Sequence, residues 1–555
     1  MNLVPNKINH SLFLNSCLVL LILLSSASCS VKGKENKLDQ RPNIILLVAD
    51  DLGYADLGCY GGDIETPNID MLAASGLRFS SYHTAPLCAP TRAMLLSGND
   101  NHIAGMGRQG LTTDEFGYEG KLTSRIATIP QILSKSGYHT YMAGKWHLGE
   151  TPEANPHQKG FEHSFAMLDG AANHYNDQGL FEGNPISPYT EDGMPATWED
   201  GDFSTDFYTD KLIEYINRHK EDKKPFFAFA AYTAPHWPLQ VDEKYWKKYE
   251  GRYDDGYDKL KQKRLQSLKK AGLIPENTVL PPNLESIKYW ESLSEKEKMK
   301  ESRKMELYAG MVDNLDFNVG RLIQHLKEMG VYENTLIVFM SDNGAAGNDF
   351  YNNDRFGPFI REHFNDDYEN MGQPNSFISY GAPWAEAGSS PFRHFKGFTT
   401  EGGMTSAMII SGPNVERKNE IHHGLTTVMD IAPTFYEATN TEYPKIFENN
   451  SLYPLKGSSI IPLARGESEE VHPSDYVFGF EHNNKAMIRK GKWKITNDKR
   501  PFSIQNFELF DLSIDLGEQN DLKELEPNKY EELLMEWSKF SEEIKVQVPT
   551  PSGGD

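Results

Sequence analysis

Basic residues are scarce in this 555-residue chain, in which 56 lysines and arginines face 79 aspartates and glutamates. The formal net charge is −23. Because a protein that binds nucleic acid needs a basic surface, the composition argues against nucleic acid as a partner. It leaves a small anionic substrate open, since a few local cations or a bound metal ion can reverse the field inside a pocket.

Cysteine is scarce as well. Cys17 and Cys29 lie in the N-terminal segment, and Cys59 and Cys88 lie in the rest of the chain. In an oxidising compartment, one interpretation of the last two is a Cys59–Cys88 disulfide. Another is that Cys88 is a plain thiolate nucleophile, which would normally need a dedicated base.

The apolar run from Ser11 to Leu24 is too short for a comfortable membrane span. It follows Lys7, so it predicts a secretory signal over residues 1–29, with a retained anchor helix as the alternative. Cys29 after SSAS resembles a bacterial lipoprotein processing site, and ordinary cleavage near Ala27 is the other possibility. Residues 30–40 are polar and predict a linker. We therefore expect an exported protein, periplasmic or lipid-anchored in the cell envelope, with no membrane contact other than a lipid on Cys29.

The chain has no solenoid-type repeat. Strand and helix patterns alternate instead, beginning with the apolar run Ile44 to Val48, which is typical of a strand buried on both faces. The alternation predicts an α/β fold over residues 41–465, with a mostly parallel or mixed central sheet flanked by helices. Over residues 466–555 the pattern predicts a smaller α+β domain with an antiparallel sheet and a terminal helix.

Two segments depart from this alternation. Residues 241–305 are rich in Lys, Glu and Tyr and predict solvated surface helices, because charges of both signs are mixed. Residues 353–377 are aromatic and contain Pro and Gly, and they predict a loop, either at a pocket mouth or as a surface elaboration.

Polar residues follow several of the expected strands. These residues are Asp50, Asp51, His147, His236, Asp342 and Asn343. Ligands collect at the carboxyl ends of the strands in such folds, so the shared position indicates one site. Each acidic pair alone could be an ordinary turn after a strand, and EF-hand spacing is absent. Together, four oxygen donors suit a hard cation such as calcium or magnesium.

Cys88 stands in the stretch PLCAPTRAMLLSG, where a loop leads into the expected start of a helix. Backbone N–H groups at a helix N-terminus favour an anion, and Arg92 adds a permanent positive charge. Lys145 and Lys396 lie in GKWHLG and FKGFTTEGG. A lone lysine or histidine is usually solvated or structural. If these cations converged on the expected metal site, they would form an electropositive hole for a tetrahedral anion.

The sequence resembles a known family, the type I sulfatases of the alkaline phosphatase superfamily. Within this family it is most similar to the arylsulfatase-type branch. The matching stretches, in the family's order over residues 41–522, are PNIILLVADDLGYADLGCYG, PLCAPTRAMLLSG, YMAGKWHLG, APHWP, VFMSDNGA, FKGFTTEGG, VMDIAPTF and LFDLSIDLGEQNDL. The resemblance implies an alkaline-phosphatase-like fold. It also implies that Cys88 is oxidised by a maturation enzyme to formylglycine, whose hydrate attacks sulfur with one hydroxyl and expels sulfate with the other.

The resemblance further implies ligands for a calcium ion, with magnesium as the alternative ion. These ligands are Asp50, Asp51, the modified Cys88, Asp342 and Asn343.

It also implies roles for five cationic or ionisable residues. Arg92 and Lys145 would hold the nucleophile and the sulfate, and His147 would assist the elimination of sulfate. His236 and Lys396 would contact the sulfate, and one of the two would protonate the leaving oxygen. All five are present, which argues against loss of activity.

The expected function is therefore hydrolysis of a sulfate ester, either an aryl sulfate or a sulfated carbohydrate. One alternative is a phosphodiesterase or phosphonate monoester hydrolase of the same superfamily, because a phosphoryl group fits the same hole. The other is a non-catalytic envelope protein that binds sulfated glycans.

Overall fold

The structure is a computed structural model that describes Met1 and residues 41–110, 112–198 and 201–547. The expected signal over residues 1–29 and the linker over residues 30–40 thus lie, apart from Met1, outside the described residues. From Arg41 onward the chain forms one compact unit. The boundary at residue 465 stays a prediction.

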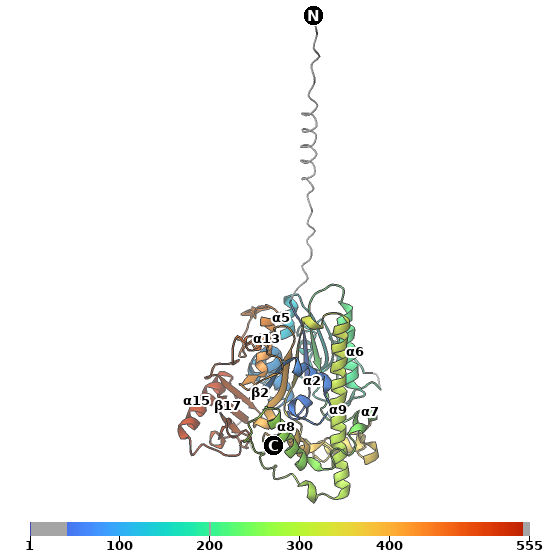
Figure 1. The fold of residues 1–555 in the computed structure, drawn as a ribbon, viewed down its shortest axis with the longest axis vertical. Coiled ribbons are helices and arrows are strands. Elements are labelled where there is room, and N and C mark those ends of the chain that lie inside the picture. The colour runs from blue at the N-terminus through green and yellow to red at the C-terminus, as the bar shows by residue number, and fades with distance from the viewer. Residues whose placement is uncertain (2–40, 111, 199–200, 548–555) are drawn as a thin grey trace. The chain divides into compact units, whose positions relative to one another are not determined.

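A sheet of eleven strands runs through the middle of this unit (Figure 1). From edge to edge, its strands are β12 (Glu420–His422), β2 (Gly76–His83), β11 (Thr405–Ser411), β10 (Thr335–Ser341), β1 (Asn43–Ala49), β9 (Phe226–Ala231), β3 (His139–Lys145), β4 (His163–Met167), β7 (Tyr189–Glu191) and β8 (Met194–Ala196), with β13 (Thr426–Thr427) also paired to β2. The central run from β10 to β4 is parallel. β11 is antiparallel to both of its neighbours, and β7 and β8 are antiparallel at one edge. The expected α/β fold with a mostly parallel sheet is confirmed.

Strand β1 shows why the sheet lies at the centre of the molecule. All seven of its residues are buried. Ile45 and Leu47 enter one hydrophobic core, whereas Ile44 and Leu46 enter the other. Because successive side chains point to opposite faces of a strand, a continuous apolar run suits a strand covered on both sides.

Helices cover each face of the sheet (Figure 1). The first face packs against α2 (Pro67–Ala74), α6 (Ser204–Arg218), α8 (Gly256–Lys270), α9 (Glu295–Glu328) and α11 (Gly381–Gly388). The second face packs against α3 (Cys88–Ser97), α4 (Asn101–Ala104), α5 (Ile129–Lys135), α13 (Ile431–Ala438) and α14 (Ile461–Ala464). The long helix α9 begins with a capping box formed by Ser294 and Glu297.

The insertion at residues 241–305 differs from the expected solvated helices. Its charged faces are exposed, but its leucines and four of its five tyrosines join the first hydrophobic core or pack against it, whereas Tyr289 is exposed. Helix α8 also buries Arg264, whose Nη1 lies 2.6 Å from Asp56 Oδ1. The sequence analysis missed this burial because it considered only the mixed charges. The apolar residues between those charges recur at helical spacing and form the buried face.

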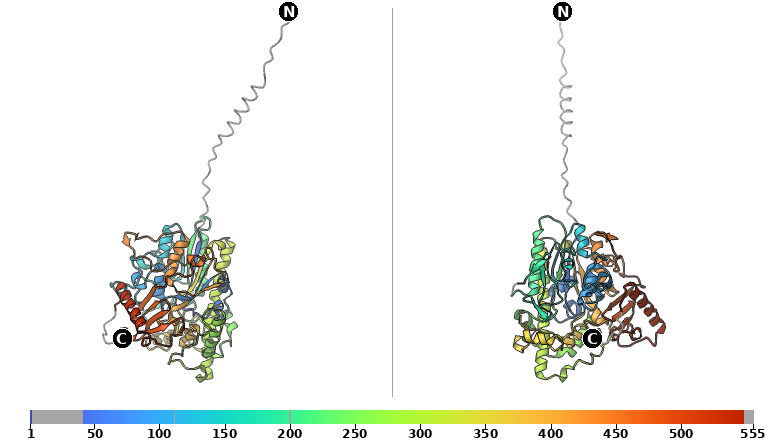
Figure 2. Two further views of the ribbon diagram at one scale, coloured as in Figure 1. Left: turned by 60° about the vertical axis from the view of Figure 1, so that its left-hand side comes forward. Right: turned by 180° about the vertical axis from the view of Figure 1, so that it is seen from behind.

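The C-terminal region has an antiparallel sheet of its own (Figure 2). Its strands, in order, are β16 (Val477–His482), β17 (Lys485–Lys490), β18 (Trp493–Asn497) and β19 (Glu508–Asp511). Helix α15 (Pro527–Glu543) packs on this sheet through Leu533 and Trp537. The expected short strands and terminal helix are confirmed.

In the part of the chain that the structure describes, no helix is both long and apolar enough to cross a bilayer.

His102 in α4 joins the region of the large sheet to the C-terminal region, because its Nε2 lies 2.9 Å from Oε2 of Glu481 in β16. Its Nδ1 lies 3.3 Å from Asp100 Oδ1. Burial opposes its charge, but the hydrogen bonds to Asp100 and Glu481 raise the pKa of His102 to about 9. Because the pKa of His102 is higher in the folded protein than in the unfolded chain, its protonation stabilises the fold. This contribution is fully present below the pKa of the unfolded chain and is lost as the pH rises through about 9. Relative to His102→Gln, the wild-type free energy of unfolding should fall by about 3 kcal/mol between pH 6 and pH 9.5. Denaturant titrations that give a pH-independent difference would contradict this.

Candidate active site

Four neighbouring strands deliver polar residues to one edge of the sheet. Strands β10, β1, β9 and β3 are parallel, so their carboxyl ends meet there. The Asp342 N–H bonds the Ala49 carbonyl at 3.1 Å, and the Asp50 N–H bonds the Ala234 carbonyl at 3.1 Å. These bonds extend the ladder beyond the strands and fix where the polar side chains begin.

Asp51 is held in a backbone conformation that is uncommon for a residue with a side chain, with φ of 68°. Its N–H donates to Asp342 Oδ1 at 3.2 Å, and its Oδ1 accepts from Asn343 Nδ2 at 2.6 Å. The left-handed turn therefore aims the Asp51 carboxylate at the residues that follow β10. Such local strain, which the surroundings must offset, is typical of functional sites.

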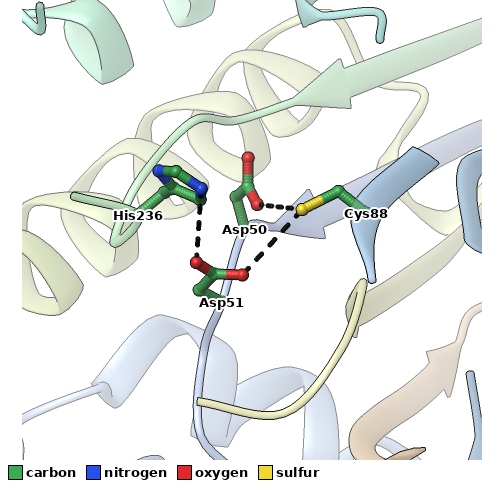
Figure 3. Close-up of side chains that lie close together, drawn as sticks. All are labelled: Asp50, Asp51, Cys88 and His236. Carbon is green, nitrogen blue, oxygen red and sulfur yellow. Dashed lines mark hydrogen bonds and ion pairs between the residues drawn. The ribbon is translucent and has the colours of Figure 1, made fainter. Parts of the chain in front are cut away.

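Cys88 is the first residue of α3, and its side chain is only 1% exposed. The Thr91 hydroxyl fixes the preceding loop, since it accepts from the Ala85 N–H at 3.0 Å and donates to the Ala85 carbonyl at 3.1 Å. Cys88 Sγ lies 3.4 Å from Asp50 Oδ1 (Figure 3). It also lies 3.2 Å from Lys396 Nζ. The side chain thus lies among the carboxylates that follow β1.

Cys59 and Cys88 are both free thiols, so the disulfide interpretation is wrong. Burial, followed by the carboxylates of Asp342 and Asp50, raises the pKa of the Cys88 thiol far above its ordinary value. An unmodified Cys88 would therefore be protonated at neutral pH. This argues against a plain thiolate nucleophile.

Each of three buried carboxylates has a buried cation beside it. Lys145 Nζ lies 2.6 Å from Asp50 Oδ2, Lys396 Nζ lies 2.6 Å from Asp51 Oδ1, and Arg92 Nη2 lies 3.1 Å from Asp342 Oδ2. Arg92 also donates to the Lys145 carbonyl at 2.8 Å. Because the three charges of each sign balance, a divalent cation bound among them would leave its own charge uncompensated and able to attract an anion.

His236 Nε2 lies 3.4 Å from Asp51 Oδ2, while its Nδ1 lies 2.7 Å from the Trp237 carbonyl. Burial lowers the pKa of His236 to about 4, with Asp51 opposing the shift. Burial and the charges of Lys145 and Arg92 also lower the pKa of His147. Both imidazoles are therefore neutral at neutral pH before an anion binds, so each can accept a proton.

Gly170 makes room for the His147 ring. A Cβ atom at position 170 would lie 2.7 Å from Cε1 and 2.8 Å from Nε2 of that ring. His147 Nδ1 is buried and makes no hydrogen bond with any described residue. The ring therefore has a nitrogen that no described neighbour satisfies.

The structure brings nine of the candidate residues into direct contact at this edge of the sheet, and the tenth, His147, lies close enough for the charges of Lys145 and Arg92 to affect its pKa. The ten residues are Asp50, Asp51, Cys88, Arg92, Lys145, His147, His236, Asp342, Asn343 and Lys396. The structure also reveals one that the sequence analysis missed. His174 Nε2 lies 3.0 Å from the His236 carbonyl, and its Nδ1 lies 2.7 Å from Ser204 Oγ. His174 thus supports the turn that carries His236. It belongs to no motif and follows no long strand, so no sequence pattern marked it.

The donor atoms fit a hard divalent cation. Asp50, Asp51, Cys88 and His236 place one ligand atom each within 4.8 Å of one another. Asp51 Oδ2 and Asn343 Oδ1 are buried without a hydrogen bond to any described residue. Burial and the nearby Asp50 raise the pKa of Asp342, which a cation would reverse. Oxygen-rich donors and unsatisfied oxygens favour calcium or magnesium.

Cavity size does not identify this site. A cavity of about 680 Å³ lies elsewhere, between β2 and the C-terminal sheet, and is lined among others by Ser80, Tyr476 and Arg489. A void of about 10 Å³ borders Asp51, Trp237 and Tyr308. We identify the site by its convergent charges, because none of the ten candidate residues lines the larger cavity.

The aromatic segment at residues 353–377 packs beside the site. It contains α10 (Gly357–His363), and its Ile360, Phe364 and Phe377 form one cluster with Trp237, the neighbour of His236. The Trp237 ring lies 5.7 Å from that of Phe377, centroid to centroid. Of the two alternatives left open for this segment, the structure favours the one near the site, although part of the segment is helical and not a loop.

Comparisons with known proteins agree with this geometry. A sequence profile of the family described as Sulfatase matches residues 42–441. An uncharacterized sulfatase of Schizosaccharomyces pombe, PB10D8.02c, is 40% identical over 531 residues, which cover 91% of this chain and 94% of that protein. An arylsulfatase of Klebsiella aerogenes is 38% identical over 433 residues, which cover 77% and 92%.

Among solved structures, Ps i-CgsB has a TM-score of 0.65 at 26% identity and covers 90% of this chain and 93% of its own. The same protein in complex with k-i-k-neocarrahexaose matches with a TM-score of 0.65 at 25% identity.

If the carboxylates hold a cation, calcium should raise the melting temperature of chelator-treated protein. The expected rise is roughly 2–3 °C at 100 times the dissociation constant. Asp51→Asn should abolish the rise. Asp316→Asn is the matched control, because this buried carboxylate accepts from the Ile69 N–H at 2.8 Å, away from the site. The control should melt lower but keep the calcium increment, and a full increment in Asp51→Asn would refute the ligand assignment.

Proposed function

The chain belongs to the sulfatase family and is a sulfuric ester hydrolase, and we propose that it hydrolyses an aryl sulfate or a sulfated carbohydrate to the alcohol and inorganic sulfate. The reaction would use a formylglycine derived from Cys88 and a bound calcium ion. The observation on which this depends is the position of Cys88 Sγ, between Asp50 Oδ1 at 3.4 Å and Lys396 Nζ at 3.2 Å.

The thiol itself is a poor nucleophile at this position, because its pKa is raised and the Asp50 carboxylate that accepts its hydrogen bond is already paired with Lys145. Conversion of Cys88 to a hydrated aldehyde would supply two hydroxyl groups, one to attack sulfur and one to expel sulfate. A cation held by Asp50, Asp51, Asp342 and Asn343 would supply positive charge beside that nucleophile. The hydrated aldehyde could therefore act as the nucleophile at position 88, whereas the thiol would stay protonated there.

The residues around Cys88 stabilise charge. Lys145, Lys396 and Arg92 are fixed by ion pairs with the carboxylates, so their charges are in place before the substrate binds. Negative charge that builds on the sulfuryl oxygens meets these preorganised cations, which is usually the largest contribution to catalysis. Removal of a single such donor typically costs a factor of about 100–1000 in rate.

Two groups manage protons. His147 has an unsatisfied ring nitrogen and a lowered pKa, so it can accept a proton from the hydroxyl that expels sulfate. On the other side, Lys396 and His236 both lie beside Asp51. Lys396 has a proton to donate, and His236 would have one if a bound anion raised its pKa, so one of the two protonates the departing alcohol oxygen. In the balanced sequence, one hydroxyl of the hydrated aldehyde would form a bond to sulfur while the ester S–O bond breaks, and the alcohol would leave with a proton. Loss of the proton of the second hydroxyl would then break the C–O bond to sulfate and restore the aldehyde, which water would rehydrate.

A sulfated carbohydrate is one of the two substrate classes. Ps i-CgsB, which shares this fold at 26% identity, has a structure with the oligosaccharide k-i-k-neocarrahexaose. Trp237, Ile360 and Phe377 belong to a buried hydrophobic cluster beside His236. Phe181 and Phe350, which pack on it and are partly exposed, would contact the group that bears the sulfate. Export by the N-terminal signal, to the periplasm or to a lipid anchor on Cys29, would bring the enzyme to extracellular glycans, and the maturation enzyme would act on Cys88 before folding.

Replacement of Cys88 tests the nucleophile. Cys88→Ala should retain the wild-type melting temperature within about 2 °C and lose turnover by a factor of at least about 1000, since no nucleophile remains. Mass spectrometry of the Cys88 peptide from active wild-type protein should find the thiol replaced by an aldehyde. An unmodified thiol in fully active protein would overturn the mechanism.

Matched sulfate and phosphate esters test the reaction. Purified, matured enzyme should hydrolyse sulfate esters with the higher kcat/KM, because the balanced site gains only the charge of its cation and a sulfate monoester carries less negative charge than a phosphate monoester. Regiodefined sulfated sugars and nitrophenyl sulfate then separate the two substrate classes. Higher kcat/KM on phosphodiesters or phosphonate monoesters would favour the superfamily alternative. No turnover of any ester by matured protein would favour a glycan-binding role.

A further inference from the structure

Lys396 reaches the site from a segment that lacks regular structure. Residues 389–400 connect α11 to α12 (Glu401–Met404), and none of them is in a helix or strand. Gly397 adopts a left-handed φ of 88° directly after Lys396. Glycine permits this turn but also has many alternatives to it, so other contacts must select the observed conformation.

On the side of the active site, two backbone bonds hold the turn. The Lys396 N–H donates to the Ala345 carbonyl at 3.0 Å, and the Gly397 N–H donates to the Pro86 carbonyl at 2.8 Å. Pro86 lies two residues before Cys88, so the Lys396 turn and the Cys88 loop are joined directly.

On the other side, Lys485 reaches the same turn from the C-terminal sheet. Lys485 is the first residue of β17, and its Nζ donates to the Gly397 carbonyl. The same ammonium group lies 4.1 Å from the centroid of the Phe398 ring and 3.6 Å from Asp498 Oδ1. One cation thus contacts two consecutive residues of the segment immediately after Lys396.

The contacts continue along the segment. Asp498, which follows β18, accepts from the Thr399 N–H at 2.9 Å and 3.2 Å. Lys494 of β18 then bonds Glu401 Oε1 at 2.7 Å. Four of the five residues from Gly397 to Glu401 therefore contact side chains of the C-terminal region.

We propose that the C-terminal sheet positions Lys396 for catalysis and that Lys485 is the positioning residue through which it acts. Lys485 holds the Gly397 carbonyl, the turn directs Lys396, and Lys396 Nζ then meets Asp51 and Cys88 at 2.6 Å and 3.2 Å. A misplacement of about 1 Å at a reacting group can cost a factor of 100 in rate, so the support has a catalytic effect. The inference rests on the role of Lys396 in the proposed function.

Lys485→Met tests the proposal, because it removes the hydrogen bond and the charge but keeps an unbranched chain over Phe398. We expect kcat/KM for a sulfate ester to fall about 10–100-fold. Lys485→Arg, which retains a donor and a charge, should restore it to within about threefold of wild type. Lys492→Met is the matched control, because Lys492 also belongs to the C-terminal sheet region but pairs with Asp511 at 2.7 Å. It should change kcat/KM less than twofold.

A double-mutant cycle separates positioning from general stability. If Lys485 acts through Lys396, Lys485→Met should cost less than about twofold in a Lys396→Ala background. Equal losses in the two backgrounds would overturn the proposal. Asp498→Asn is a second variant for the same cycle should Lys485→Met fail to fold, and it should show the same non-additivity.

Hydrogen exchange supplies a readout that needs no turnover. The amides of Gly397 and Thr399 should exchange faster in Lys485→Met and Asp498→Asn than in wild type. In Lys492→Met their exchange rates should equal those of wild type. Unchanged exchange in the first two variants would overturn the proposal. If wild-type protein hydrolyses no sulfate ester while exchange responds as expected, the proposed function fails and the positioning contact stands.

Discussion

Three buried carboxylates at one edge of a sheet are the constraint on which the rest of the structure depends. Taken from water alone, each would cost several kcal/mol. Lys145, Lys396 and Arg92 offset that cost through ion pairs of 2.6–3.1 Å. Each cation comes from a different part of the chain, so the charge balance can form only when strands β1, β3 and β10, helix α3 and the segment at residues 389–400 are assembled.

The parallel run of β10, β1, β9 and β3 solves the assembly problem geometrically. Its strands are paired in register, for example Ala49 with Ser341, so residues that are separated by almost 300 positions leave the sheet side by side. The two hydrophobic cores then hold β1 from both faces. Rigidity at the edge thus originates in apolar packing, whereas the chemistry depends on the polar residues one or two positions beyond it.

Much of the fold and of the site could be predicted from the sequence, because the residues that form the strands and those that form the site are neighbours in the chain. The apolar run of β1 and the polar residues after it are adjacent in the chain, so the pattern that predicts the strand also predicts the site. The buried face of α9 is likewise predictable, because its apolar residues recur at helical spacing, as in Tyr308, Met311, Leu315, Val319, Leu322 and Leu326. Arg264 was missed because a charged residue in a charged segment gives no sign of a partner such as Asp56. His174 and Lys485 were missed because each acts on the backbone of a distant segment, which no spacing encodes.

Burial of Cys88 has a consequence in time. At 1% exposure, its side chain is closed to any enzyme once α3 has docked. On the proposed mechanism, oxidation must therefore precede docking, and folding competes with modification for every newly made chain. A molecule that folds first keeps its thiol and is permanently inactive, although its structure is otherwise the same. The specific activity of a preparation would then report the ratio of two rates during biosynthesis and not a property of the finished fold.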